Sequence, residues 1–289
     1  MGEHKMIDKN AFFEDGYIVL RNVIPLSLIK KNLDEIENLL KAQWRYYFDE
    51  ATYPGKDDAL IKLMNRNINY RRYLYEWLNK RMVNIGKIAE TDIVKKVLLE
   101  LDIKYPIFQS AHNRITLPAE DHFLTEWHQD IGVMDTENSI VFWLPMETAN
   151  QKNGAISVLK GSHKAGVLVP EIINYRGHSE LSPDIISKFD EIWLDYDPGD
   201  LLIFHTKTIH NAKPNRTDKC RWAGIFRFDD ALDTKYFDLE TSPLSKGYIM
   251  KKSEGSVSGF VENKADVGEK DENKQAVIKT YKSLGKISV

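Results

Sequence analysis

The sequence contains one cysteine, Cys220, among its 289 residues. A single thiol excludes an internal disulfide framework and a cysteine-based zinc site. No apolar run approaches the ~18 residues needed to cross a bilayer, and the longest, Ile140–Met146, has the length of a strand. The N-terminus also lacks the apolar stretch of a signal peptide. These absences predict a cytoplasmic protein that has no membrane partner.

An excess of charge of either sign is also missing. The chain has 40 basic and 43 acidic side chains, for a formal net charge of -3. Bulk electrostatic binding of nucleic acid needs a clustered basic surface, so we expect no nucleic-acid partner. Hydrophobic residues make up 42% of the chain and aromatic residues 11%. This content can build a sizeable core and excludes wholesale disorder.

The first third of the chain is expected to form a helical support over about residues 26–104. One helix face is marked by apolar residues at spacings of three and four, namely Ile29, Leu33, Ile36 and Leu40. A second helix is expected over 70–88, and a third begins after an N-cap at Thr91–Asp92. Before these helices, residues 13–20 predict a turn that leads into a short strand.

From about residue 106 to 230 the pattern changes to short β-rich runs separated by Gly, Pro and Asn turns. The runs are Ile107–Leu117, Ser139–Met146, Ala155–Leu159, Leu201–His205 and Arg221–Phe228. Many short strands predict a sandwich or barrel. We expect one domain over 1–250, with a long inserted loop at 170–192 that carries a short helix over 183–189. The polar tail, 251–289, has one candidate helix at 276–284.

A histidine and an aspartate two residues apart, in Trp127-His128-Gln129-Asp130, point to metal chemistry. On a strand, His128 and Asp130 share a face and can bind one divalent ion. A second histidine from another strand would complete a facial triad, which is typical of non-haem Fe(II) oxygenases. The spacing alone is a weak signal in a chain with 8 histidines and 43 acidic residues. A second pair, His178-Ser179-Glu180, lies in a polar loop and is taken as a chance match.

His210 is the preferred third ligand. It follows the turn at 197–200 and the buried-strand pattern Leu201–Phe204. His205, only five residues earlier, is the competitor. The sequence therefore predicts a metal site formed by His128, Asp130 and His210.

Two arginines lie on one side of the apolar run Arg221–Phe228. An arginine at the start of such a run needs a partner, because an unpaired buried charge is costly. The best partner is a bidentate carboxylate, so Arg221 could hold a ligand carboxylate near the metal. Arg227, six residues on, is expected to reach the site or to form a salt bridge at its rim.

This order of residues resembles the phytanoyl-CoA dioxygenase family over about residues 8–230. The similar segments are Glu14–Leu20, Trp127–Asp130, Trp143, Asn153–His163, Gly199–His205, His210 and Arg221. The resemblance implies a mainly β fold with α-helices, namely a double-stranded β-helix (jelly-roll, cupin-like) core flanked by N-terminal helices. It also implies Fe(II), with 2-oxoglutarate as cosubstrate alongside O2.

By this resemblance His128, Asp130 and His210 match the metal triad. Arg221 matches the arginine that binds the distal carboxylate of 2-oxoglutarate.

Four further residues are candidates for binding the cosubstrate or the substrate. Arg114-Ile115-Thr116 is similar to a segment of ectoine hydroxylases in which an asparagine contacts the cosubstrate, and Thr116 stands at the asparagine's position. Trp143 is placed like a family tryptophan that borders the cosubstrate pocket. Arg114 and Arg227 are the candidates for substrate binding.

The resulting prediction is an Fe(II)- and 2-oxoglutarate-dependent dioxygenase. It would hydroxylate an unactivated C–H bond of a small metabolite or biosynthetic intermediate, release succinate and CO2, and need no side-chain acid or base. Related halogenases lack the carboxylate ligand, so Asp130 favours hydroxylation over halogenation. Desaturation, cyclisation and epimerisation stay open. The alternatives are a zinc or manganese jelly-roll hydrolase or isomerase, which would not need Arg221, and a non-catalytic jelly roll that binds a small ligand.

Overall fold

The computed structural model describes residues 7–119, 126–134, 136–168, 172–173 and 179–233. The α-helices are α1 (Lys9–Asp15), α2 (Leu26–Tyr47), α3 (Lys56–Met64), α4 (Ile68–Lys80), α5 (Val83–Ala89), α6 (Asp92–Glu100) and α7 (Pro183–Ile186). Short 3-10 turns are η1 (Glu50–Thr52), η3 (Asp130–Val133), η4 (Gln151–Asn153) and η5 (Ser162–Ala165). The strands are β1 (Tyr17–Leu20), β2 (Pro106–Thr116), β3 (Ile140–Pro145), β4 (Ile156–Leu159), β5 (Ile172–Ile173), β6 (Ser179–Glu180), β7 (Glu191–Ile192), β8 (Leu201–His205), β9 (His210–Ala212) and β10 (Arg221–Asp230).

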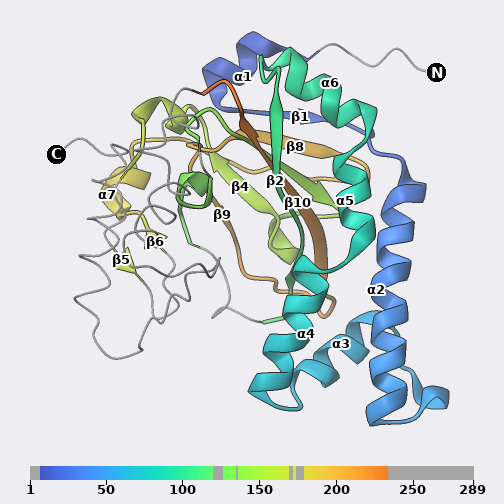
Figure 1. The fold of residues 1–289 in the computed structure, drawn as a ribbon. Coiled ribbons are helices and arrows are strands. Elements are labelled where there is room, and N and C mark those ends of the chain that lie inside the picture. The colour runs from blue at the N-terminus through green and yellow to red at the C-terminus, as the bar shows by residue number, and fades with distance from the viewer. Residues whose placement is uncertain (1–6, 120–125, 135, 169–171, 174–178, 234–289) are drawn as a thin grey trace, which may run out of the picture.

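Two antiparallel sheets form the β core. The larger sheet has the order β1-β8-β3-β10-β2, and the smaller has the order β7-β4-β9. In Figure 1 helices α2, α4, α5 and α6 lie on one side of the larger sheet, and β4 and β9 lie on its other side. This arrangement confirms the predicted mainly β fold with flanking N-terminal helices.

Strand alternation divides the interior into two cores. Along β10, Trp222 and Phe226 pack against the helices, whereas Ala223 and Ile225 pack toward the smaller sheet. Strands β3 and β8 follow the same rule, since successive side chains of a strand point to opposite faces. The face that looks toward the smaller sheet, called the inner face here, carries the candidate site.

The long helix α2 confirms the predicted apolar face, with Ile29, Ile36 and Leu40 buried. The single helix expected over 70–88 is wrong, because the structure has α4 and α5 with a break at Arg81–Met82. Glu35 of α2 explains the break, since its carboxylate accepts hydrogen bonds from the backbone N–H groups of Val83 and Asn84. A carboxylate from another helix thereby caps the first turn of α5.

The other predicted elements are close to the observed ones. The strand expected near residue 20 is β1, and Gly16 before it is left-handed at φ 82 and ends α1, a helix that the sequence did not predict. Helix α6 starts after Thr91 as expected, and α7 is shorter than the helix predicted over 183–189. The polar tail and its candidate helix lie outside the described residues. None of the helices described is long and apolar enough to span a membrane.

Gly154 fixes the turn that leads into β4. It has a positive φ of 78, and a Cβ on it would lie 2.2 Å from the backbone oxygen of Lys213, just after β9. Gly161 is also left-handed, at φ 70, but a Cβ there would meet only the backbone oxygen of Glu14, at an ordinary contact distance of 3.7 Å. The two positions therefore separate backbone strain from a steric clash.

We expect Gly154→Ala to lower the free energy of unfolding by about 3 kcal/mol or more, because it combines a strained φ with a clash against backbone. Gly161→Ala should cost only about 1 kcal/mol, because it has the strain of a left-handed backbone alone. Denaturant unfolding of both variants measures the difference. Equal losses would contradict the close packing of β4 against the segment after β9.

Candidate functional site

The three proposed metal ligands come from two chain segments that lie side by side. His128 and His210 form an isolated β-bridge, in which each backbone N–H donates to the other residue's carbonyl at 3.1 Å. The N–H of Asp130 donates to the carbonyl of Thr206 at 3.0 Å. The strand expected for residues 127–130 is therefore wrong in detail, because η3 begins at Asp130. Pairing with the segment 206–210, not a regular strand, brings both side chains to one side.

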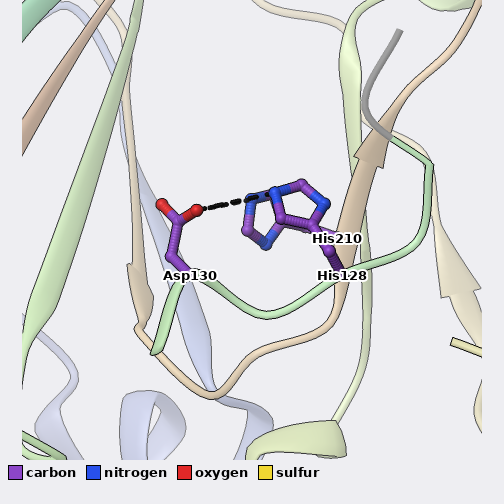
Figure 2. Close-up of side chains that lie close together, drawn as sticks. All are labelled: His128, Asp130 and His210. Atoms are coloured by element: carbon purple, nitrogen blue, oxygen red, sulfur yellow. Dashed lines mark ion pairs between the residues drawn. The ribbon is translucent and has the colours of Figure 1, made fainter. Parts of the chain in front are cut away.

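The ligand atoms of the three side chains converge (Figure 2). Oδ1 of Asp130 lies 3.5 Å from Nε2 of His128 and 4.0 Å from Nε2 of His210. All three candidate ligand atoms lie within 4.8 Å of one another, and this is the one such group of metal-binding residue types among the residues described. Ligand atoms about 2.1 Å from a shared ion lie roughly 3 to 3.5 Å apart, so the observed spacing needs only a small contraction to hold a divalent metal.

Backbone hydrogen bonds orient both imidazoles. Nδ1 of His128 lies 2.7 Å from the carbonyl of Glu126, and Nδ1 of His210 lies 3.0 Å from the carbonyl of Thr208. A carbonyl only accepts, so each Nδ1 carries the proton and each Nε2 presents its lone pair toward Asp130. This is the arrangement that histidine ligands of metals normally show.

The protonation states also suit a metal. Burial, with the neighbouring His128, lowers the pKa of His210 to about 3, so this ring is neutral near pH 7. Burial alone would raise the pKa of Asp130, but the positive charge of Arg227, together with the neighbouring imidazoles of His128 and His210, holds it well below its usual value. The site thus offers a neutral imidazole at His210 and an ionised carboxylate at Asp130.

His205, the competing ligand, lies in a different environment. Its Nδ1 accepts a hydrogen bond from the backbone N–H of Lys207 at 3.1 Å, and its ring centroid lies 5.6 Å from that of His163. It is not part of the His128–Asp130–His210 group. His178, from the second histidine–acid pair, lies outside the described residues.

Arg221 lies at the start of β10 and is buried. Its Nη2 donates to Oγ1 of Thr116 at 2.6 Å, and its guanidinium lies 5.6 Å from the ring centroid of Trp143. Three of the residues that the sequence singled out for the cosubstrate therefore meet on the inner face. Burial lowers the pKa of Arg221 to about 10, with a smaller contribution from Arg114, so the guanidinium stays charged at pH 7.

The Arg221 guanidinium has no carboxylate partner among the described residues, and its buried Nε has no hydrogen-bond partner there. A buried cation in this state is costly unless a ligand pairs with it. The planar fork of N–H donors that remains suits a carboxylate. The local chemistry therefore fits the distal carboxylate of 2-oxoglutarate.

The two candidate substrate-binding arginines occupy different places. Arg227 lies on the inner face of β10, and its Nε donates to Oδ2 of Asp130 at 2.9 Å. Arg114 lies on β2 opposite Ala223, two residues before Thr116 and on the same face. The structure thus places Arg227 beside the three candidate metal ligands and Arg114 beside Arg221.

Gln129 is a structural member of the site that the sequence did not single out. Its Nε2 donates to the carbonyls of Gly166 and Lys207 at 2.9 and 2.7 Å, and its Oε1 accepts from the N–H of Leu168 at 2.9 Å. The side chain between the two ligands thereby holds two neighbouring loops in place. The only sequence signal for this role is that a polar residue, Gln129, stands between His128 and Asp130.

The buried, neutral state of His205 predicts a pH-dependent stability. Burial, with help from Lys207 and His163, lowers its pKa to about 3, whereas an unfolded histidine titrates near 6.5. The unfolded chain takes up the proton first, so stability that is complete above about pH 6.5 is lost as the pH falls toward 3.

We expect the loss of unfolding free energy between pH 7.5 and 5 to be smaller in His205→Asn than in the native protein, by about 2 kcal/mol. Denaturant unfolding at both pH values measures it, and any constant cost of the substitution cancels in the difference. An identical loss in the two proteins would show that His205 does not titrate as its burial implies.

Comparison with known proteins agrees with this geometry. The sequence profile of the family "Phytanoyl-CoA dioxygenase (PhyH)" matches residues 12–223. The peroxisomal phytanoyl-CoA dioxygenase of Bos taurus is 30% identical over 81% of this chain and 71% of its own. An iron/alpha-ketoglutarate-dependent dioxygenase of Aspergillus calidoustus is 25% identical over 69% of this chain and 63% of its own.

Among solved structures, EvdO2 from Micromonospora carbonacea var. aurantiaca, complexed with 2-oxoglutarate, has a similar fold. Its TM-score is 0.53 at 20% identity, over 80% of this chain and 94% of that chain. The match of the family profile to most of the chain agrees with the sheets, the helical layer and the His–Asp–His group. The chain belongs to the phytanoyl-CoA dioxygenase family, whose chemistry depends on Fe(II) and 2-oxoglutarate.

Proposed function

We propose that the protein is an Fe(II)- and 2-oxoglutarate-dependent dioxygenase that hydroxylates an unactivated C–H bond of a small metabolite or biosynthetic intermediate. Arg221 carries the proposal. A buried guanidinium without a carboxylate partner among the described residues needs a ligand anion, and it lies on the same face of β10 as Arg227, which contacts Asp130. A metal hydrolase on the same triad would have no need for such a cation.

The residues present fit the metal and the cosubstrate. His128, Asp130 and His210 would hold Fe(II) through two Nε2 atoms and Oδ1, and Arg221 would bind the far carboxylate of 2-oxoglutarate. When bound, the iron and 2-oxoglutarate supply the oxidant, as O2 is consumed and succinate and CO2 are released. Two histidines and one carboxylate leave coordination positions for these ligands.

The chain's own residues position and shield the reactants. Thr116 accepts a hydrogen bond from Arg221 and holds the guanidinium plane, while Trp143 lies against it. Phe204 lies with its ring centroid 4.5 Å from that of His210 and limits the room for water on that side of the metal. Arg114, on the same face, is a candidate for binding the substrate. No side chain is needed as a general acid or base.

Hydroxylation is the outcome that the carboxylate ligand and the relatives' names support. Asp130 occupies the position that a halogenase of this kind leaves for halide. A relative in Streptomyces arenae, 29% identical over 34% of this chain and 37% of its own, carries the name 1-deoxypentalenic acid 11-beta-hydroxylase. We infer the same class of reaction here.

The proposal is tested by titrating the metal-free protein with Fe(II) and 2-oxoglutarate without oxygen. A keto acid chelated to iron should give a weak visible charge-transfer band in the native protein. Arg221→Gln should weaken 2-oxoglutarate binding by about 10- to 100-fold, because it removes a charged hydrogen-bonded pair. Its affinity for the metal alone should change little, because Arg221 contacts none of the three ligands.

Arg45→Gln is the control, since Arg45 is exposed on α2 and, among the described residues, pairs only with Glu50. Arg221→Lys, which keeps the charge without the fork, should give an intermediate affinity. A native protein that binds Fe(II) but gives no band, or an Arg221→Gln variant with native 2-oxoglutarate affinity, would favour the hydrolase or ligand-binding alternatives.

A further inference from the structure

The two oxygens of Asp130 have different partners. Oδ1 faces the histidines, at 3.5 Å from His128 and 4.0 Å from His210. Oδ2 faces away from them and accepts a hydrogen bond from Nε of Arg227 at 2.9 Å. Both side chains of this pair are largely buried, with 6% of Asp130 and 15% of Arg227 exposed. The carboxylate is therefore held in one orientation.

The contact with Asp130 is the only side-chain hydrogen bond or ion pair of Arg227 within the part of the chain that the structure describes. No second carboxylate there shares the guanidinium. Arg227 therefore links β10 to η3 through this one ion pair. Its charge acts on one group, the metal carboxylate.

The backbone around Arg227 is irregular at this point. Arg227 pairs with Ser110 of β2, but the next residue, Phe228, pairs with Phe108, so β2 carries one extra residue, Gln109. Bulges of this kind bend a strand and re-aim side chains, and they are frequent beside active sites. Arg227 is the last residue of β10 before this shift and therefore lies directly beside the bulge in β2.

Single-oxygen binding by Asp130 matters for the number of free positions on the metal. An octahedral ion has six, of which three protein ligands leave three. A chelating keto acid would take two of these and leave one for O2. A carboxylate can also bind a metal through both oxygens, and this mode would remove the last free position.

We propose that Arg227 is a positioning residue that restricts Asp130 to binding the metal through Oδ1 and so preserves the free coordination positions. This inference rests on the proposed metal site but not on 2-oxoglutarate as cosubstrate. A guanidinium on Oδ2 blocks the second metal–oxygen bond by geometry, and its positive charge opposes the approach of the metal to that oxygen.

The test counts the coordination positions directly, with Mn(II) as a probe and without turnover. Mn(II) bound by three protein ligands carries about three waters, and a carboxylate that binds through both oxygens leaves about two. We expect the relaxation of bulk water protons by the Mn(II)-loaded protein to fall by about a third in Arg227→Met. Mn(II) affinity should stay native or increase, because the neighbouring positive charge is lost.

Two further variants make this readout specific. Arg227→Lys keeps a positive donor for Oδ2 and should restore most of the native water relaxation. Arg21→Met is the matched control, since Arg21 holds another largely buried carboxylate, Asp200, through Nη1 at 2.6 Å and contacts none of the metal residues. This control should leave both Mn(II) affinity and water relaxation unchanged.

Native water relaxation in Arg227→Met would overturn the proposal, because Asp130 would then bind through one oxygen without help. A weaker Mn(II) affinity with an unchanged number of waters per bound ion would overturn it too, since that result indicates a structural role only. Neither outcome depends on 2-oxoglutarate, so a failure of the cosubstrate assignment, seen as a missing charge-transfer band, remains distinguishable from a failure of this inference.

Discussion

Both faces of strand β10 are buried and each serves a different purpose, so the alternation of its side chains between these faces constrains the rest of the structure. It lies between β2 and β3 in the larger sheet. One face packs Trp222 and Phe226 against the helices, and the other presents Arg221 and Arg227 to the site. Since side chains alternate along a strand, a shift of one residue in register would bury both arginines in the helical core. The register of β10 against β2 and β3 therefore fixes both the apolar face that packs against the helices and the face that carries the site.

The buried charges of the site have two different kinds of partner. Asp130, the two histidines and Arg227 form one group in which the carboxylate and the guanidinium neutralise each other. Arg221 is different, because it has a threonine hydroxyl and an aromatic ring as neighbours but no carboxylate among the described residues. An unpaired buried cation lowers the folding stability of a protein. A ligand carboxylate that pairs with Arg221 would explain why the cation is there. The same strand face thus holds one arginine for the protein's own carboxylate and another suited to a ligand.

Local patterns predicted most of the regular elements and missed features that depend on distant partners. The apolar spacing of Ile29, Ile36 and Leu40 predicted α2, and the β-rich runs predicted the main strands to within a few residues. The break between α4 and α5 was missed, because the group that caps α5 is the carboxylate of Glu35 on another helix. The strand expected around His128 was wrong for the same reason, since its hydrogen bonds go to the segment 206–210 and do not continue as a ladder.

The sequence by itself determined which residue types could carry the chemistry, and in what order they occur. His128, Asp130, His210 and Arg221 were found from turn and strand patterns together with a family resemblance, because such signals lie within a few neighbouring residues. Only the tertiary structure decided that His210, and not His205, lies with His128 and Asp130 in the candidate metal site, and that Arg227 contacts Asp130. Residues 130 and 227 lie 97 positions apart, and their contact depends on the register of β10 and the irregularity beside it. No local sequence pattern predicts such a contact, because the packing of the two sheets determines it.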